Sequence, residues 1–246
     1  MGYIDFHAHL SPKEESRLDL LLKMDQLSID HAVVVAGSVV SPHTLSYHFA
    51  KGGGLNLSID NTAVLESCKK SEGKLFPFFF ANPYEPENYE KVGKTFYGLK
   101  IAPIVHGVPF ADSQMTRLFS KALDLGHSVY LHCLPHAGFT VEDLVRTGEK
   151  FPELPLVLGH AGLCQCDYWG VDLIAGLPNL YLETSGAFSH LAKYALDKLG
   201  EKRVLFGTEY PLQHPKVEVV KAECIGFSPE MTFRNASRLV DFRRTV

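Results

Sequence analysis

The chain has 246 residues, of which 46% are hydrophobic and 21% are charged, and its formal net charge is −4 at pH 7. This composition is typical of a globular domain, and the length is sufficient for one α/β barrel. The mildly acidic balance and the lack of a long basic run argue against nucleic acid or an anionic membrane as the main partner.

Short apolar runs alternate with helical patterns along nearly the whole chain. The apolar runs are continuous, as expected of parallel strands that are buried on both faces, and they predict strands at 3–10, 31–36, 75–81, 97–101, 128–133, 156–159, 180–184 and 203–207. The helical patterns lie at 12–27, 60–73, 86–96, 112–126, 140–151, 168–176, 189–199, 215–224 and 229–240. Residues 37–59, with Gly52-Gly53-Gly54, are expected to form an irregular loop, and loops of such length are often lids or disordered.

Eight strands that alternate with helices predict an α/β fold, the (β/α)8 TIM barrel, formed as a single domain by residues 1–246. The alternative is an open doubly wound sheet, which would usually carry a glycine-rich phosphate loop after its first strand. Here the first strand ends in His7 and His9, which favours the barrel. The active site is then expected at the carboxyl ends of the strands.

The sequence also indicates the cellular location of the protein. No apolar run approaches the roughly 20 residues that a transmembrane helix needs. A predicted strand begins at Tyr3, which leaves no room for a signal peptide, and the five cysteines are an odd number, which favours reduced thiols. We therefore expect a cytoplasmic protein.

The first strand, YIDFHAHL, carries a candidate metal-binding pair. Residues i and i+2 of a strand point to the same face, so His7 and His9 leave the strand side by side. Polar residues at the exit of a strand would also explain the pair alone. However, further candidate ligands stand at the ends of other predicted strands, namely Lys100, His132, His160, Glu183 and Glu209. Such a ring offers the converging lone pairs that a divalent cation needs.

Six pieces of the chain form a recognisable set, which is DFHAHL, YGLKI, VYLHC, LVLGHAG, LFGTEYP and the closing NASRL. They run from near residue 3 to near residue 239, and together they resemble the amidohydrolase superfamily, in the amidohydrolase-related branch that includes aminocarboxymuconate semialdehyde decarboxylase. This branch contains metal-dependent hydrolases, and decarboxylases and hydratases of carboxylated aromatic or muconate-like substrates. The resemblance implies that His7, His9 and His132 bind metal and that His160 lies close to the metal or the substrate.

One residue departs from the pattern of that family, which normally has aspartate after the eighth strand. Here Glu209 stands in FGTEYP, and its extra methylene moves the carboxylate by roughly 1.5 Å. Metal sites hold their distances to about ±0.2 Å, so three alternatives are open. Glu209 binds the metal, or it acts only as an acid and base through a water, or the site is altered with weak or no metal. We favour the first two, because the three strand-end histidines remain.

Two other residues near the predicted site have more than one interpretation. Lys100 could be carboxylated and bridge two metal ions, as in binuclear members of the superfamily. It could also bind a substrate carboxylate as a plain lysine, or be an ordinary charged residue at a barrel rim. His136, which comes after the fifth strand, is expected to be a solvated loop histidine.

The first hypothesis for the function is a metal-dependent hydrolase of a small molecule with a carbonyl-type group. A divalent ion, zinc with manganese as the alternative, would be held by His7, His9, His132 and Glu209. Glu209 would also move the proton of the attacking water, His160 would polarise the substrate oxygen, and Lys100 is the third candidate catalytic residue.

Two alternatives use the same scaffold. One is a metal-dependent nonoxidative decarboxylase of a small carboxylic acid, and the other is a degenerate barrel that binds without catalysis. Because members of the family are often dimers, a homodimer is the expected candidate assembly.

Overall fold

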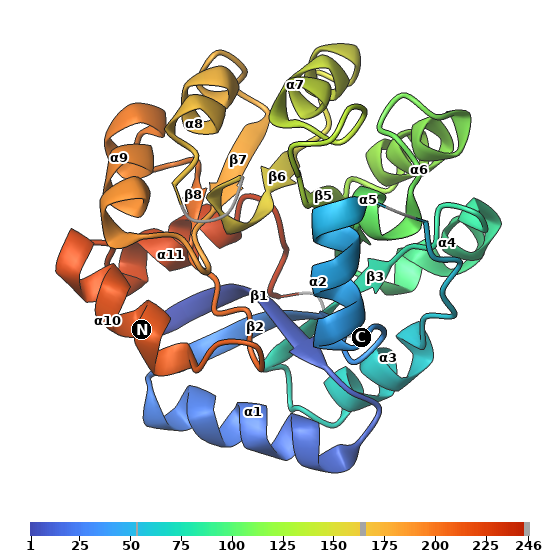
Figure 1. Cartoon of the computed structure of the whole chain (residues 1–246). Helices are drawn as coiled ribbons and strands as arrows, with labels where there is room; N and C mark the ends of the chain where they lie inside the picture. Colours follow the sequence, from blue (N-terminus) through green and yellow to red (C-terminus); the bar gives the residue numbers. More distant parts are fainter. Residues whose placement is uncertain (53, 163–165, 244–246) are drawn as a thin grey trace.

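The computed structural model describes residues 1–52, 54–162 and 166–243. Eight parallel strands pair in the order β1 to β8, and helices surround them, which confirms the predicted (β/α)8 barrel (Figure 1). The strands are β1 (Tyr3–Leu10), β2 (Ile29–Ala36), β3 (Leu75–Phe80), β4 (Gly98–Ile101), β5 (Ser128–Leu131), β6 (Leu156–Leu158), β7 (Leu180–Glu183) and β8 (Val204–Leu205).

The helices mostly agree with the predicted helical patterns. They are α1 (Glu14–Gln26), α2 (Pro42–Lys51), α3 (Asn61–Lys69), α4 (Pro86–Val92), α5 (Pro103–His106), α6 (Ser113–Asp124), α7 (Val141–Lys150), α8 (Tyr168–Ala175), α9 (Ser189–Leu199), α10 (Pro215–Ile225) and α11 (Pro229–Ala236). Many begin at a side chain that accepts a hydrogen bond from the first turn, as N-caps do; these are Ser41, Asp60, Asp112, Thr140, Asp167, His214 and Ser228. No helix in the described part of the chain is long and apolar enough to cross a membrane.

The prediction that residues 37–59 form an irregular loop was wrong, because the segment contains α2. Ser41 caps this helix by accepting from the backbone N–H of Thr44 at 3.1 Å. The Nε2 atom of His136 lies 2.9 Å from the carbonyl oxygen of Phe49 and ties α2 to the loop after β5. The helix therefore lies at the end of the barrel where the strands terminate. Of the three glycines in this segment, Gly53 lies outside the described residues.

The barrel interior is a packed apolar core that leaves only one end free for polar side chains. Strand residues that point inward form it, including Phe6 and Phe78, whose ring centroids lie 5.7 Å apart. At the amino-terminal end of the strands, Ala236, Leu239 and Val240, in α11 and after it, belong to the same buried cluster. The carboxyl ends of the strands are thus left as the place for a site.

The barrel closes between β8 and β1 through backbone hydrogen bonds that continue beyond the short β8. The N–H of Phe6 donates to the carbonyl oxygen of Phe206 at 2.7 Å, and the N–H of Glu209 donates to the carbonyl oxygen of His7 at 2.9 Å. The buried Asp5 carboxylate also accepts from the backbone N–H of Thr208 at 3.0 Å. This closure fixes Glu209 beside His7.

The side chain of Asn61 replaces a strand partner along the upper part of β3, and its removal is expected to destabilise the barrel. β2 pairs only with Leu75–Pro77, and Asn61 contacts the backbone of Phe80 instead, with Oδ1 accepting at 2.8 Å and Nδ2 donating at 2.9 Å. Because a buried group without a partner costs about 1–3 kcal/mol, Asn61→Ala should lower the free energy of unfolding by about 2–3 kcal/mol.

Urea denaturation with Asn88→Ala as the matched control measures this loss. The Asn88 side chain is exposed on α4, so its removal should change the free energy of unfolding by less than about 0.5 kcal/mol. Equal losses in the two variants would contradict the role of Asn61.

Candidate metal centre

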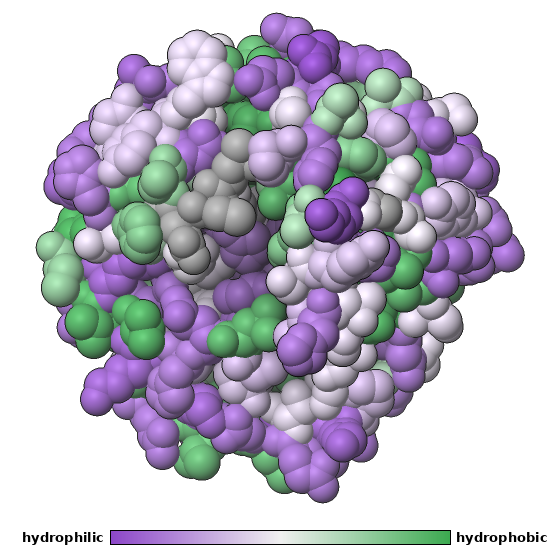
Figure 2. Space-filling model, in the orientation of Figure 1, coloured by the Kyte–Doolittle hydropathy of each residue, from purple (hydrophilic) through white to green (hydrophobic). Residues whose placement is uncertain are grey.

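Side chains in the last part of β1 and just after β5, β6 and β8 meet at the carboxyl end of the barrel. They form two overlapping groups, His7 with His132 and His160, and His7 with His9 and Glu209. Within each group the candidate ligand atoms all lie within 4.8 Å of one another. Figure 2 shows a hollow near the centre of the face that carries α2, with hydrophilic residues inside it. The structure thus brings together the five residues predicted to bind metal or to lie beside it, while the role of each stays a prediction.

The imidazole nitrogens and the carboxylate oxygens of the cluster lie close to one another. The Nε2 atom of His7 lies 3.0 Å from Oε2 of Glu209, and Nε2 of His9 lies 3.4 Å from Oε1 of the same carboxylate. On the other side, Nε2 of His160 lies 2.7 Å from Nε2 of His132 and 3.7 Å from Oε2 of Glu209. These atoms all point toward one small volume.

Burial sets the charge state of this cluster. Desolvation, with the nearby Lys100 as the next cause, holds the pKa of His7 and of His132 well below the usual range, so both imidazoles are neutral and keep a lone pair. Burial alone would raise the pKa of Glu209, but the neighbouring imidazoles of His160, His7 and His9 outweigh it and hold that pKa well below its usual range. His7 and His132 are therefore lone-pair donors beside an ionised carboxylate.

The donor atoms fit a divalent metal ion. Despite their close approach, Nε2 of His7, Nε2 of His9 and Oε2 of Glu209 are buried and have no hydrogen-bond partner among the described residues. Each such atom costs about 1–3 kcal/mol unless it is paired, and a cation would pair all three. Imidazole nitrogens together with a carboxylate oxygen suit zinc and manganese. This donor set agrees with the predicted divalent-metal cofactor. Which ion the residues bind is part of the function proposed below.

Lys100 lies inside the barrel beside these donors. It is 1% exposed, and its Nζ atom lies 2.6 Å from Nε2 of His132 and 4.1 Å from the centroid of the Tyr130 ring. Burial lowers the pKa of Lys100 to about 7. An ordinary charged residue at the rim does not fit this burial, so carboxylation and the binding of a substrate carboxylate remain as interpretations.

The family model described as an amidohydrolase matches residues 4–222. The chain belongs to the amidohydrolase family. This confirms the predicted family and the prediction of an amidohydrolase-type, metal-dependent enzyme. A search of curated proteins found no match.

Solved structures with the same fold share few residues with this amidohydrolase. A 5-carboxyvanillate decarboxylase of Novosphingobium aromaticivorans, complexed with manganese and 4-hydroxy-3-methoxy-5-nitrobenzoic acid, is 17% identical with a TM-score of 0.72, over 98% of this chain and 96% of that chain. A dihydroxybenzoic acid decarboxylase of a Polaromonas species, with manganese and the inhibitor 2-nitroresorcinol, is 18% identical with a TM-score of 0.70, over 99% and 98%. A probable 2-pyrone-4,6-dicarboxylic acid hydrolase of Acinetobacter baumannii, with citric acid bound, is 16% identical with a TM-score of 0.68, over 99% and 100%.

Two residues beside the centre, Tyr130 and Ser185, were not predicted as members of the site, and both contact Glu183, which was named as a candidate strand-end ligand but belongs to neither donor group. The Tyr130 ring stacks on the His7 ring with centroids 4.0 Å apart, and its hydroxyl donates to Oε2 of Glu183 at 2.6 Å. Tyr130 stands two residues before His132, and Ser185 two residues after Glu183, so strand alternation could have indicated that each pair shares a face.

His136 differs from its prediction as a solvated loop histidine. Its side chain is partly buried, and its Nε2 atom contacts the carbonyl oxygen of Phe49 in α2. It is not a member of either donor group.

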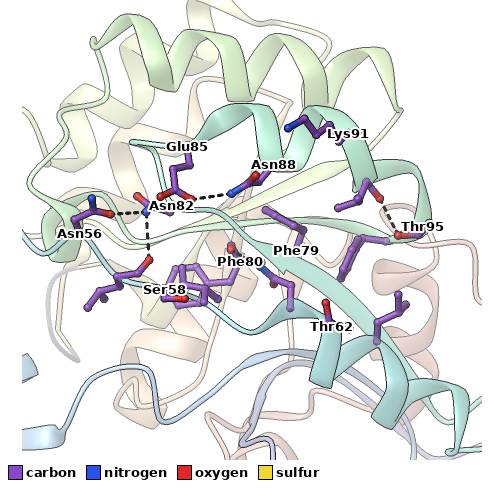
Figure 3. A pocket seen from close by; sticks show the side chains of 16 residues that line it. Asn56, Ser58, Thr62, Phe79, Phe80, Asn82, Glu85, Asn88, Lys91 and Thr95 are labelled. Atoms are coloured by element: carbon purple, nitrogen blue, oxygen red, sulfur yellow. Dashed lines mark hydrogen bonds between the residues drawn. The ribbon is translucent and has the colours of Figure 1, made fainter.

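A separate pocket of about 650 Å³ lies against α3, β3 and α4 and contains none of the donor residues (Figure 3). Its polar side chains bond to the protein, since Nδ2 of Asn82 donates to Oδ1 of Asn56 at 2.7 Å and Nδ2 of Asn88 donates to Oε2 of Glu85 at 2.8 Å. No lining side chain in the described part of the chain holds a buried polar atom that lacks a partner. In the described part of the chain, this pocket therefore differs from the donor cluster, which holds buried polar atoms without a partner.

Proposed function

We propose that this amidohydrolase is a metal-dependent nonoxidative decarboxylase of a small carboxylic acid. The observation that carries the proposal is the cluster of four imidazoles and one carboxylate at the carboxyl end of the barrel, in which the buried Nε2 atoms of His7 and His9 and Oε2 of Glu209 have no hydrogen-bond partner among the described residues. Two of the solved structures with the same fold are decarboxylases of hydroxylated aromatic acids and hold manganese. That support favours the decarboxylase over the hydrolase that the sequence suggested first.

In the proposed reaction the bond between the substrate carbon and its carboxylate breaks, and carbon dioxide leaves. The electron pair stays on the carbon, which takes up one proton, so that a carboxylate and a proton become carbon dioxide and a C–H product. We propose that His7, His9, His132 and Glu209 hold the ion, which when bound would withdraw electron density from substrate oxygens.

Side chains of the protein would transfer the proton and attract the substrate. Glu209 is ionised, so it would first take up a proton from water and then pass this proton to the carbon; its Oε2 atom faces His7 and His160. Lys100, buried behind His132 with a pKa of about 7, is partly protonated at neutral pH, and its protonated form would attract an anionic substrate. The small-molecule substrate is part of this proposal, and the homodimer and the cytoplasmic location stay predictions.

Carbon dioxide release tests the proposal directly. The chain loaded with Mn²⁺ or Zn²⁺ is incubated with 5-carboxyvanillate and 2,6-dihydroxybenzoate that carry a ¹³C-labelled carboxylate. We expect labelled carbon dioxide in equal amount to the decarboxylated product, and none with His132→Ala. Hydrolysis of 2-pyrone-4,6-dicarboxylate without carbon dioxide release would restore the hydrolase. Metal-loaded chain that turns over neither class of substrate would favour the non-catalytic barrel.

A further inference from the structure

A fully buried carboxylate, that of Glu183 at the end of β7, lies behind the metal centre. Its Oε2 atom accepts from the Tyr130 hydroxyl at 2.6 Å, from the Ser185 hydroxyl at 2.8 Å and from the backbone N–H of His160 at 3.2 Å. Its Oε1 atom accepts from the backbone N–H of Ser185. A buried carboxylate is tolerated only when donors satisfy it, and here every donor belongs to a residue that borders the centre.

The directions of these hydrogen bonds determine where the proton of His160 lies. Four donors surround the two oxygens of Glu183, so the carboxylate acts only as an acceptor and the Ser185 proton points to it. The Ser185 oxygen is then free to accept, and it lies 2.9 Å from Nδ1 of His160. Nδ1 must therefore carry the proton in the neutral imidazole, which leaves a lone pair on Nε2.

This lone pair points into the donor cluster. Nε2 of His160 is grouped with the ligand atoms of His7 and His132, and it lies 2.7 Å from Nε2 of His132. An Nε2 atom without a proton cannot donate to a substrate oxygen. In this arrangement His160 would serve as a metal ligand or a proton acceptor, and not as the group that polarises a substrate oxygen, which is the role that the sequence suggested.

We propose that Glu183 and Ser185 are positioning residues that fix His160 in the Nδ1–H tautomer, so that His160 enters the centre as a lone-pair donor. The tautomer is a property of the chain itself, and only the measurement of carbon dioxide release rests on the proposed decarboxylase function. Partners bound to the second nitrogen of a histidine orient metal ligands in this way in many proteins.

The backbone around His160 supports the same assignment. His160 has a φ of 57° and a ψ of 27°, a left-handed conformation that costs a non-glycine residue roughly 1–2 kcal/mol. The hydrogen bond from its N–H to Glu183 holds it there. The same carboxylate orients Tyr130, whose ring stacks on His7, so that one buried group positions two imidazoles of the centre.

A second buried pair holds the loop that carries Ser185. The Glu218 carboxylate accepts from the backbone N–H of Gly186 at 3.1 Å, and the Lys221 ammonium donates to the carbonyl oxygens of Thr184 at 2.7 Å and Ala187 at 3.0 Å. Glu218 and Lys221 also form an ion pair with each other. The loop is therefore held on both sides of Ser185, as expected for a residue that positions the side chain of His160.

Nitrogen NMR of ¹⁵N-histidine-labelled protein tests the tautomer, with His160→Gln used to assign the His160 signals. The spectrum is recorded with and without Zn²⁺, which is diamagnetic. We expect a protonated Nδ1 in the wild type and in Ser185→Thr, which keeps the hydroxyl, and loss of this preference in Ser185→Ala and in Glu183→Gln. Ser128→Ala is the matched control, because Ser128 is also buried but stands at the opposite end of β5. It should leave the His160 signals unchanged.

Zinc titration of the same variants gives a second readout. The affinity should fall about 10–100-fold in Ser185→Ala, as when other outer partners of ligands are removed, and should recover in Ser185→Thr. A protonated Nε2 in the wild type, or an unchanged tautomer in both Ser185→Ala and Glu183→Gln, would overturn the inference. If the tautomer is as expected but no carbon dioxide is released from any substrate, the proposed function fails and the positioning role stands.

Discussion

Replacing His132 with alanine is expected to remove the divalent ion and, with it, the activity. The wild-type chain, purified without chelator and reconstituted with Zn²⁺ or Mn²⁺, should hold about one equivalent per chain, as mononuclear sites do. Burial keeps His132 neutral, so its Nε2 atom has a lone pair at neutral pH, and without it the described donor group around His160 retains only His7. Because losing even an outer partner of a ligand costs about 10–100-fold in affinity, losing this nitrogen should cost more than about 100-fold.

The matched control for this loss is His136→Ala. His136 comes after the same strand, but it contacts the carbonyl oxygen of Phe49 and lies outside both donor groups. Elemental analysis and calorimetric titration should therefore show full metal content in this variant. A wild-type chain that holds no metal after reconstitution, or a His132→Ala variant that keeps it, would contradict the assignment of the metal centre. Two equivalents in the wild type would instead support a carboxylated Lys100 that bridges two ions.

The barrel and the ring of donors could be predicted because both depend on local patterns. Continuous apolar runs marked the strands, and in a parallel barrel the residues just after each strand all lie at the same end. β8 differs most from its prediction, since residues 203–207 were predicted and only Val204–Leu205 pair with β7. Beyond Leu205 the backbone turns to β1, where Phe206 accepts from Phe6 and Thr208 donates to Asp5. A single run of apolar residues cannot show such a change of partner.

Helix α2 and the Glu183 network could not be predicted for two different reasons. None of the residues of α2 is fully buried, and its apolar stripe is short, with Leu45 and Phe49 packed against the core, so only Ser41-Pro42 clearly marked its start. Glu183 was noted at the end of a strand, but its hydrogen bonds reach Tyr130 and His160, which are far away in the sequence. Which distant groups a buried carboxylate meets is decided by the closed barrel and not by its own neighbours in the chain.

Replacing Glu209 with glutamine is expected to lower kcat by about 10²–10⁴-fold, the usual effect of removing a group that transfers a proton. The variant keeps the length of the side chain but has no carboxylate. In the wild type, the two carboxylate oxygens face Nε2 of His7 at 3.0 Å and Nε2 of His9 at 3.4 Å. Steady-state kinetics on the metal-loaded chain measure the loss. Glu149→Gln removes the same charge from an exposed position on α7 and should leave kcat unchanged.

Glu209→Asp then tests the length of this side chain separately from its charge. Aspartate keeps the carboxylate but withdraws it by roughly 1.5 Å from His7 and His9, so kcat should fall less than in Glu209→Gln and remain below that of the wild type. Metal content in the two variants decides between the roles left open for Glu209. If Glu209→Gln loses both the ion and kcat, the carboxylate is a ligand. If it keeps the ion and loses only kcat, the carboxylate acts as acid and base. A Glu209→Gln variant with wild-type kcat would remove Glu209 from the reaction altogether, and the proton would then have to come from another group of the centre.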